Sequence, residues 1–274
     1  MKTSPKRRVL ISSVAMLLVA MLALGTATYA WFTVDTKATA DGLKVQTSKM
    51  SSLLISDATM AKYETAFSYA PSQYMIPTSS INAKNWYSAT ADAEDSYKST
   101  TAAKLVNLTT SPKQYVFRDQ LNIWNSGEVA VNDVKIVVSG FNNHNYLRFA
   151  LVEVDGKGVG KTVAEADFRK NVYANDNVAY NPVKPTSATD TTGVYSTAAA
   201  DQITPIQVTG DTFEIPVSTS LAADSYKYYN LYVWFEGQDP DCKNANAGTG
   251  TSDGSNNTPN GLTFEVTGTP QTQS

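Results

Sequence analysis

The chain has 274 residues, of which 17% are charged and 42% hydrophobic, and its formal net charge is −3. This length suits one large all-β domain or two small ones, and the mildly acidic charge, without a basic patch, argues against nucleic-acid binding. The single cysteine, Cys242, excludes an intramolecular disulfide, so a secreted domain of this size depends on its hydrophobic core.

The N-terminal segment has the three parts of a secretory signal peptide. A basic head precedes an apolar run from Val9 to Leu24, and small residues follow, with Thr28 and Ala30 at positions −3 and −1. The run is shorter than the roughly 18–20 residues of a spanning helix. We therefore expect a signal peptide over residues 1–30, cleavage between Ala30 and Trp31, and no membrane span after processing. The alternative is an uncleaved anchor, and in both cases the protein works outside the cytoplasm.

The region after the predicted cleavage site is extended and then irregular. Residues 31–48 lack proline and space their apolar residues at a period near two, which is typical of an extended segment. Residues 51–55 predict a short buried strand. Residues 57–103 carry scattered aromatic residues and two prolines, so we interpret them as a long connection, with room for a short helix within 88–103.

The clearest strand patterns begin at Gln114. Alternating apolar residues predict strands over 114–124, 129–138, 146–154, 202–207, 212–217, 226–236 and 262–266. Residues 163–170 predict one or two helical turns, and 171–200 predict an exposed loop with at most one short strand. In 226–236 aromatic and apolar residues occupy both faces, which indicates a central strand buried on at least one side.

Eight or more strands without βαβ alternation predict an all-β fold, a jelly-roll type β-sandwich with long loops and a few short helical turns. We expect one domain over 49–270, a flexible loop over 239–261 and a disordered tail over 271–274.

The sequence offers little support for catalysis. The one histidine, His144, lies in an Asn-rich turn and is a poor base for a hydrolytic triad, and HExxH does not occur. The string Gly250-Thr251-Ser252-Asp253-Gly254 has the spacing GxSxG but lies in the loop predicted over 239–261, so we expect no nucleophile elbow. The segment Gly156–Thr162 fails the spacing of a phosphate loop and is interpreted as a glycine-rich turn. We expect no enzymatic activity. Cys242 is expected to be a partly buried small residue, with cross-linking of two chains as the alternative.

Acidic residues gather where the last long strand gives way to the flexible loop. Carboxylates on a loop are the ligands that Ca²⁺ requires, so Glu236, Asp239 and Asp241, with Asp253 nearby, form a candidate calcium site. Their spacing matches no EF-hand loop, and a solvated acidic loop without an ion is the alternative. No other cofactor is expected.

The signal-peptide exit resembles that of a known family. Residues 25–33, with Trp31-Phe32 directly after the cleavage site, and the later Gly42-Leu43-Lys44-Val45 are similar to the SipW-dependent secreted proteins of Gram-positive bacteria, which include TasA-type biofilm fibre proteins and camelysin-like proteins. Residues 121–127, the following VNDVKI strand and 232–242 are family-like but weaker matches. The resemblance covers about a third of the chain.

The resemblance implies a jelly-roll surface protein that is processed by a SipW-type signal peptidase and exported to the extracellular matrix or cell surface. In fibre-forming relatives the freed N-terminal segment inserts as a strand into the next subunit, which gives an open filament. The residues that would carry this self-association are Trp31, Phe32, Val34, Ala38, Ala40, Leu43 and Val45. The alternatives are a monomeric surface module that binds polysaccharide or a host surface through its tyrosines and the 239–261 loop, and a secreted hydrolase. The metallopeptidase class given to camelysin-like members has no supporting residues here.

Overall fold

The computed structural model describes Met16 and residues 53–69, 76–88, 103–105, 115–140, 146–158, 160–186, 192–210, 212–239, 242 and 262–271. The chain divides into a unit over Met1–Thr47 and a unit over Ser48–Ser274, and the strands found among the described residues belong to the second. The predicted signal peptide, its cleavage site and the extended segment 31–48 lie outside the described residues, apart from Met16. No helix within the described ranges is both long and apolar enough to cross a membrane.

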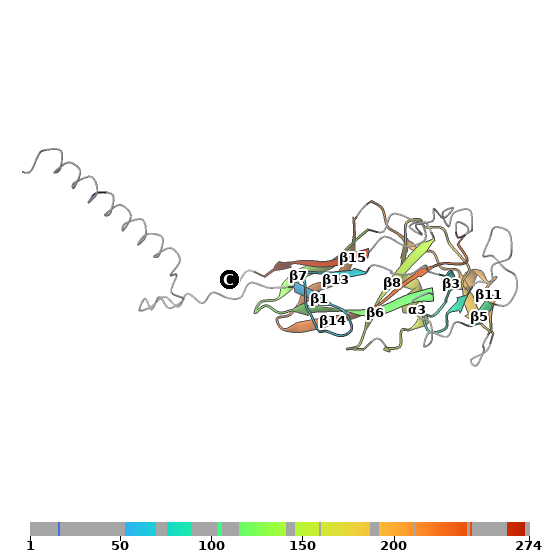
Figure 1. The fold of residues 1–274 in the computed structure, drawn as a ribbon, viewed down its shortest axis with the longest axis horizontal. Helices are drawn as coiled ribbons and strands as arrows, with labels where there is room; N and C mark the ends of the chain where they lie inside the picture. Colours follow the sequence, from blue (N-terminus) through green and yellow to red (C-terminus); the bar gives the residue numbers. More distant parts are fainter. Residues whose placement is uncertain are drawn as a thin grey trace, which may run out of the picture. The chain divides into compact units, whose positions relative to one another are not determined.

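The regular secondary structure described in the second unit is almost all β-strand, with one short α-helix and one 3-10 turn, which confirms the all-β class (Figure 1). In chain order the elements are β1 (Leu53–Ser56), β2 (Ala66–Tyr69), β3 (Thr78–Ser79), β4 (Tyr87–Ser88), β5 (Ala103–Leu105), β6 (Val116–Asn125), β7 (Val131–Ser139), β8 (Leu147–Val154), α3 (Glu165–Lys170), β9 (Val172–Ala174), β10 (Val183–Pro185), β11 (Thr192–Tyr195), η1 (Ala199–Asp201), β12 (Ile206–Gln207), β13 (Thr212–Leu221), β14 (Ser225–Phe235) and β15 (Leu262–Pro270).

Two larger sheets form the body of this unit. One has six strands in the order β1-β6-β14-β8-β9-β12, and the other has four in the order β13-β7-β15-β2. Pairing within them is antiparallel except between β9 and β12. Successive strands often change sheet: β1 and β6 are in the first, while β2 and β7 are in the second.

The core lies between the inner faces of these two sheets. Leu231 and Val233 of β14 are buried in it together with Val134 and Ile136 of β7. Phe149 of β8 meets Phe264 of β15 edge to face, with ring centroids 6.1 Å apart. Each such side chain contributes about 1.5–3 kcal/mol by leaving water. The alternation predicted for β7 is thus confirmed, and so is the prediction that 226–236 form a central, buried strand.

The outer face of the six-stranded sheet is covered in its middle by a loop held on buried amides. Gln120 on β6 and Asn230 on β14 are at most 1% exposed. The Gln120 amide donates to the carbonyls of Gly156 and Gly158, both at 3.3 Å, and Asn230 Nδ2 donates to the carbonyl of Lys161 at 2.9 Å. The glycine-rich segment within 156–162 therefore follows an antiparallel strand and is held on the sheet by side-chain hydrogen bonds.

A buried aromatic cluster continues this outer face. Trp86, which precedes β4, meets Trp234 edge to face with ring centroids 5.2 Å apart. Phe168 is the buried residue of α3 and packs edge to face on Tyr232 at 5.8 Å. Phe168 is thus the one side chain of α3 that is buried, and it attaches the short helix to the outer face of the sheet.

A third sheet, in the order β10-β11-β5-β4-β3, adds five short strands to the fold. It corrects two predictions. Residues 57–103 are not only a connection, since β2, β3 and β4 lie within them, and 171–200 contain three short strands instead of at most one. The ends of the predicted helix over 88–103 belong to β4 and β5, and its interior lies outside the described residues.

Gly193 in β11 allows the third sheet to pack tightly. A Cβ atom placed there would lie 2.5 Å from Val183 Cγ1 and 2.7 Å from Tyr87 Cδ1. We expect Gly193→Ala to destabilise the domain by about 1–3 kcal/mol through overpacking, measured by urea unfolding. Gly160→Ala is the control, because nothing lies within 4 Å of the added atom. Equal stability of the two variants would contradict this packing.

Candidate functional site

Two of the acidic residues predicted as calcium ligands, Glu236 and Asp239, lie in a turn directly after β14. The N–H of Glu236 donates to the carbonyl of Tyr146 at 2.9 Å, and the N–H of Gly237 donates to that of Thr78 in β3 at 3.0 Å. The N–H of Asp239 then returns to the carbonyl of Glu236 at 3.1 Å. These bonds fold the end of β14 inward, so that Glu236 is fully buried and Asp239 is 2% exposed.

A buried arginine is the centre of this region. Arg148, on β8 opposite Trp234, is completely buried and forms an ion pair with Asp239. A second, longer contact joins its Nη2 to Asp176 Oδ1 at 3.4 Å, and its Cζ lies 5.7 Å from the ring centre of Tyr180. A buried guanidinium is stable only with such compensation, because losing its hydration costs several kcal/mol.

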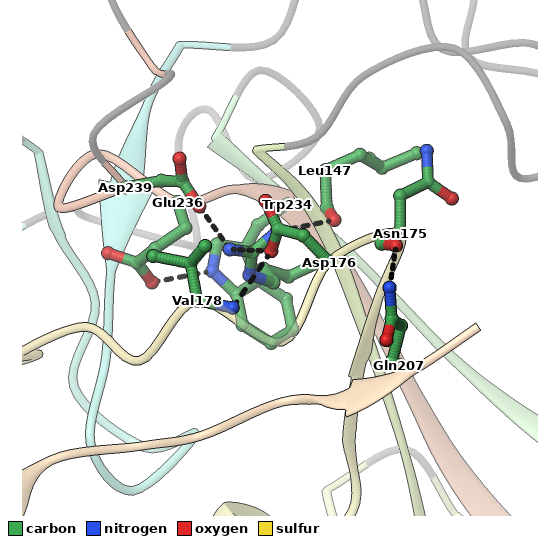
Figure 2. Close-up of polar contacts among 9 residues, drawn as sticks. Leu147, Asn175, Asp176, Val178, Gln207, Trp234, Glu236 and Asp239 are labelled. Carbon is green, nitrogen blue, oxygen red and sulfur yellow. Dashed lines mark hydrogen bonds and ion pairs between the residues drawn. The ribbon is translucent and has the colours of Figure 1, made fainter. Parts of the chain in front are cut away.

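Glu236 lies in the same cluster and accepts hydrogen bonds from its own strand end (Figure 2). Trp234 Nε1 donates to Oε2 at 3.0 Å, and the N–H of Gln238 donates to Oε1 at 3.0 Å. Burial nevertheless dominates and raises the pKa of Glu236 to about 7. Burial also raises the pKa of the Tyr180 phenol well above its usual range.

The cluster joins segments that are far apart in the chain. Figure 2 shows the labelled residues converging from β8, from the turn after β9 and from the end of β14. Gln207 of β12 donates to the carbonyl of Asn175 at 3.3 Å and so attaches the sheet edge to the same turn. The three ionisable side chains Arg148, Glu236 and Asp239 are at most 2% exposed, so a dissolved substrate does not reach them. We call this group of three side chains the clasp, because it ties β8 to the end of β14.

Cys242 lies beside this clasp. It is 2% exposed, as expected for a small buried residue, and its N–H donates to the carbonyl of Asp239 at 3.0 Å. Burial raises the pKa of its thiol above the usual range. A protonated, buried thiol is poorly placed for cross-linking two chains.

The calcium site stays a prediction. Glu236 and Asp239 are brought together but are already bonded to protein donors, and Asp241 and Asp253 lie outside the described residues. Within the described ranges no three His, Cys, Asp or Glu residues form a group able to hold a metal ion.

The sheet edges are the second feature of functional interest. β13, at one edge of the four-stranded sheet, carries Pro216 and an irregular register between Pro216 and Ser218, and both features protect an edge from pairing. β2, at the other edge, pairs only with β15 in the described part of the chain. It contains no proline, and its register with β15 is regular.

A groove runs beside β2. Its volume is about 330 Å³, and its lining residues come from the end of β1, the β1–β2 connection and β2: Ile55, Ser56, Asp57, Thr59, Ala61, Lys62, Glu64, Ala66, Phe67 and Ser68. Within the described ranges, a strand edge without a second pairing partner and a groove for side chains therefore lie next to each other.

Several predicted residues fall outside the described ranges, namely His144 and the whole set Trp31, Phe32, Val34, Ala38, Ala40, Leu43 and Val45. Conversely, sequence reasoning missed Arg148 and Asp176. The signal for Arg148 was present, because one arginine within the apolar strand YLRFALVEV has to find a buried partner.

The chain matches no protein-family model, no curated protein and no solved structure. Its function is therefore argued from its own residues.

Proposed function

We propose that this protein is a secreted structural subunit of an extracellular fibre or biofilm matrix, with its all-β unit arranged as a jelly roll. Export rests on the signal-peptide pattern of residues 1–30, with the cut before Trp31. The change of sheet between successive strands supports the jelly-roll arrangement.

Subunits assemble by strand donation. Residues 31–47 of one copy add to the edge of β2 in the next, where main-chain groups supply affinity and alternate side chains enter the groove. The observation that carries this proposal is the edge of β2 that pairs with no further strand of the described residues and lies beside the 330 Å³ groove. Because donor and acceptor are different surfaces, the contact is head to tail and yields a filament instead of a closed ring.

Truncation of the donor segment tests assembly. We expect the mature chain 31–274 to form filaments in negative-stain electron microscopy and the 46–274 chain to remain dispersed, because it has lost most of the donated strand. Circular dichroism of 46–274 serves as the folding control, since all described strands lie beyond residue 52. Filaments from both chains would exclude residues 31–45 as the donor, and a mature chain that stays monomeric at high concentration would favour the monomeric surface-binding module.

A further inference from the structure

A second cavity lies on the outer face of the six-stranded sheet, away from the groove beside β2. Its volume is about 240 Å³. Two connections and two strands contribute its lining residues: Asn82, Ala83, Lys84, Arg118, Gly160, Lys161, Thr162, Val163 and Tyr232.

The charged side chains that line this cavity are all positive. Lys84, Arg118 and Lys161 come from three separate segments, are exposed to solvent, and form no ion pair with any described residue. Among the described residues that line it, none is acidic, although the chain as a whole carries a net charge of −3. Three cations around one concave space attract an anion.

One wall of the cavity is held rigidly by local hydrogen bonds. Ser80 Oγ accepts the N–H of Ala83 at 3.0 Å, and Asn82 Oδ1 accepts the N–H of Lys84 at 3.0 Å. Trp86 Nε1 donates to the carbonyl of Ala83 at 2.9 Å, and Ala83 has a φ of 56°, a left-handed conformation that is strained for alanine. The surrounding bonds hold Ala83 in this conformation.

A second wall is formed by the glycine-rich turn, which hydrogen bonds hold on the sheet. The buried amide of Asn230 holds the carbonyl of Lys161, and Gln120 accepts the N–H of Gly158 at 2.7 Å. Both walls of the cavity are thus fixed before any ligand arrives, which lowers the entropic cost of binding.

We propose that this cavity binds an acidic sugar residue of a polysaccharide. The carboxylate or phosphate of the sugar lies among Lys84, Arg118 and Lys161, which are charged hydrogen-bond donors. Ala83, Val163 and Tyr232 give the cavity an apolar side for the C–H face of the ring. The volume lies just below the roughly 300–1,000 Å³ of pockets for drug-sized ligands, so it suits one sugar ring.

Binding is measured by isothermal titration with a galacturonate trisaccharide, a galactose trisaccharide as the neutral match, and inorganic phosphate. We expect the galacturonate to bind, the galactose not to bind, and sodium chloride to weaken the interaction. Each of Lys84→Gln, Arg118→Gln and Lys161→Gln should weaken binding about three- to fivefold, as for exposed charge pairs, and the triple variant should abolish it. Lys170→Gln, an exposed lysine at the end of α3, is the matched control and should bind as the parent does.

The proposal would be overturned if the neutral and acidic trisaccharides bound equally well, or if the triple variant bound as tightly as the parent. It would also be overturned if galacturonate did not bind at millimolar concentration, whether or not inorganic phosphate bound. Unfolding curves of the triple variant should match those of the parent, because the three side chains are exposed. The site does not depend on filament assembly. The 46–274 chain should therefore bind galacturonate as the mature chain does, and failure of assembly would leave this result unchanged.

Discussion

Arg148→Met is expected to destabilise the domain by about 3–5 kcal/mol, because it leaves the carboxylate of Asp239 buried without its cation. For a domain of this size the change corresponds to a Tm lowered by roughly 6–20 °C. Urea unfolding followed by tryptophan fluorescence measures the loss directly.

Two controls distinguish a buried pair from an ordinary surface contact. Lys227→Met removes an ion pair with Glu153 whose side chains are 32% and 50% exposed, and it should cost less than about 1 kcal/mol. The double variant Arg148→Met/Asp239→Asn should be more stable than Arg148→Met alone, since the orphaned carboxylate is gone. Losses that simply add in the double variant would show that Arg148 and Asp239 are not coupled.

Glu236 is expected to make the stability of the domain fall as pH rises. Its pKa is about 7 in the folded protein, against 4.5 for an ordinary glutamate. Between these values the folded protein keeps a proton that the unfolded chain has released, so the free energy of unfolding decreases with increasing pH. By pH 8 the accumulated loss is about 3 kcal/mol.

Glu236→Gln isolates this effect, because it removes the titrating group while keeping the size of the side chain. We expect the parent to lose stability relative to this variant as pH rises from 5 to 8, measured by urea unfolding at each pH. Other titrating groups, including His144, are common to both proteins and cancel in the difference. Parallel pH profiles would show that Glu236 is ionised throughout this range.

The long strands could be predicted from sequence because their periodicity extends over many residues. In β7 apolar side chains recur at every second position and become its buried face, and in β14 aromatic and apolar side chains on both faces match a strand whose last seven residues are all buried. The short strands could not be predicted in this way. β3, β4 and β12 have two residues each and owe their conformation to neighbouring strands.

The clasp was only partly predictable, for a different reason. Glu236 and Asp239 were recognised as an acidic pair, but their partner Arg148 is about ninety positions earlier and becomes adjacent only through the pairing of β8 with β14. Similarly, the cations Lys84, Arg118 and Lys161 show no common motif in the sequence, and the outer face of one sheet brings them together.

The pairing of β2 with β15 determines when this protein can finish folding. Ser68 lies opposite Thr263, which is 195 residues later in the chain, so β2 cannot complete its pairing until that later segment has been synthesised. Contacts over such separations form slowly, because a long loop has to close first. The four-stranded sheet therefore stays incomplete until β15 has been synthesised, and a nascent chain that lacks this strand is still incompletely folded.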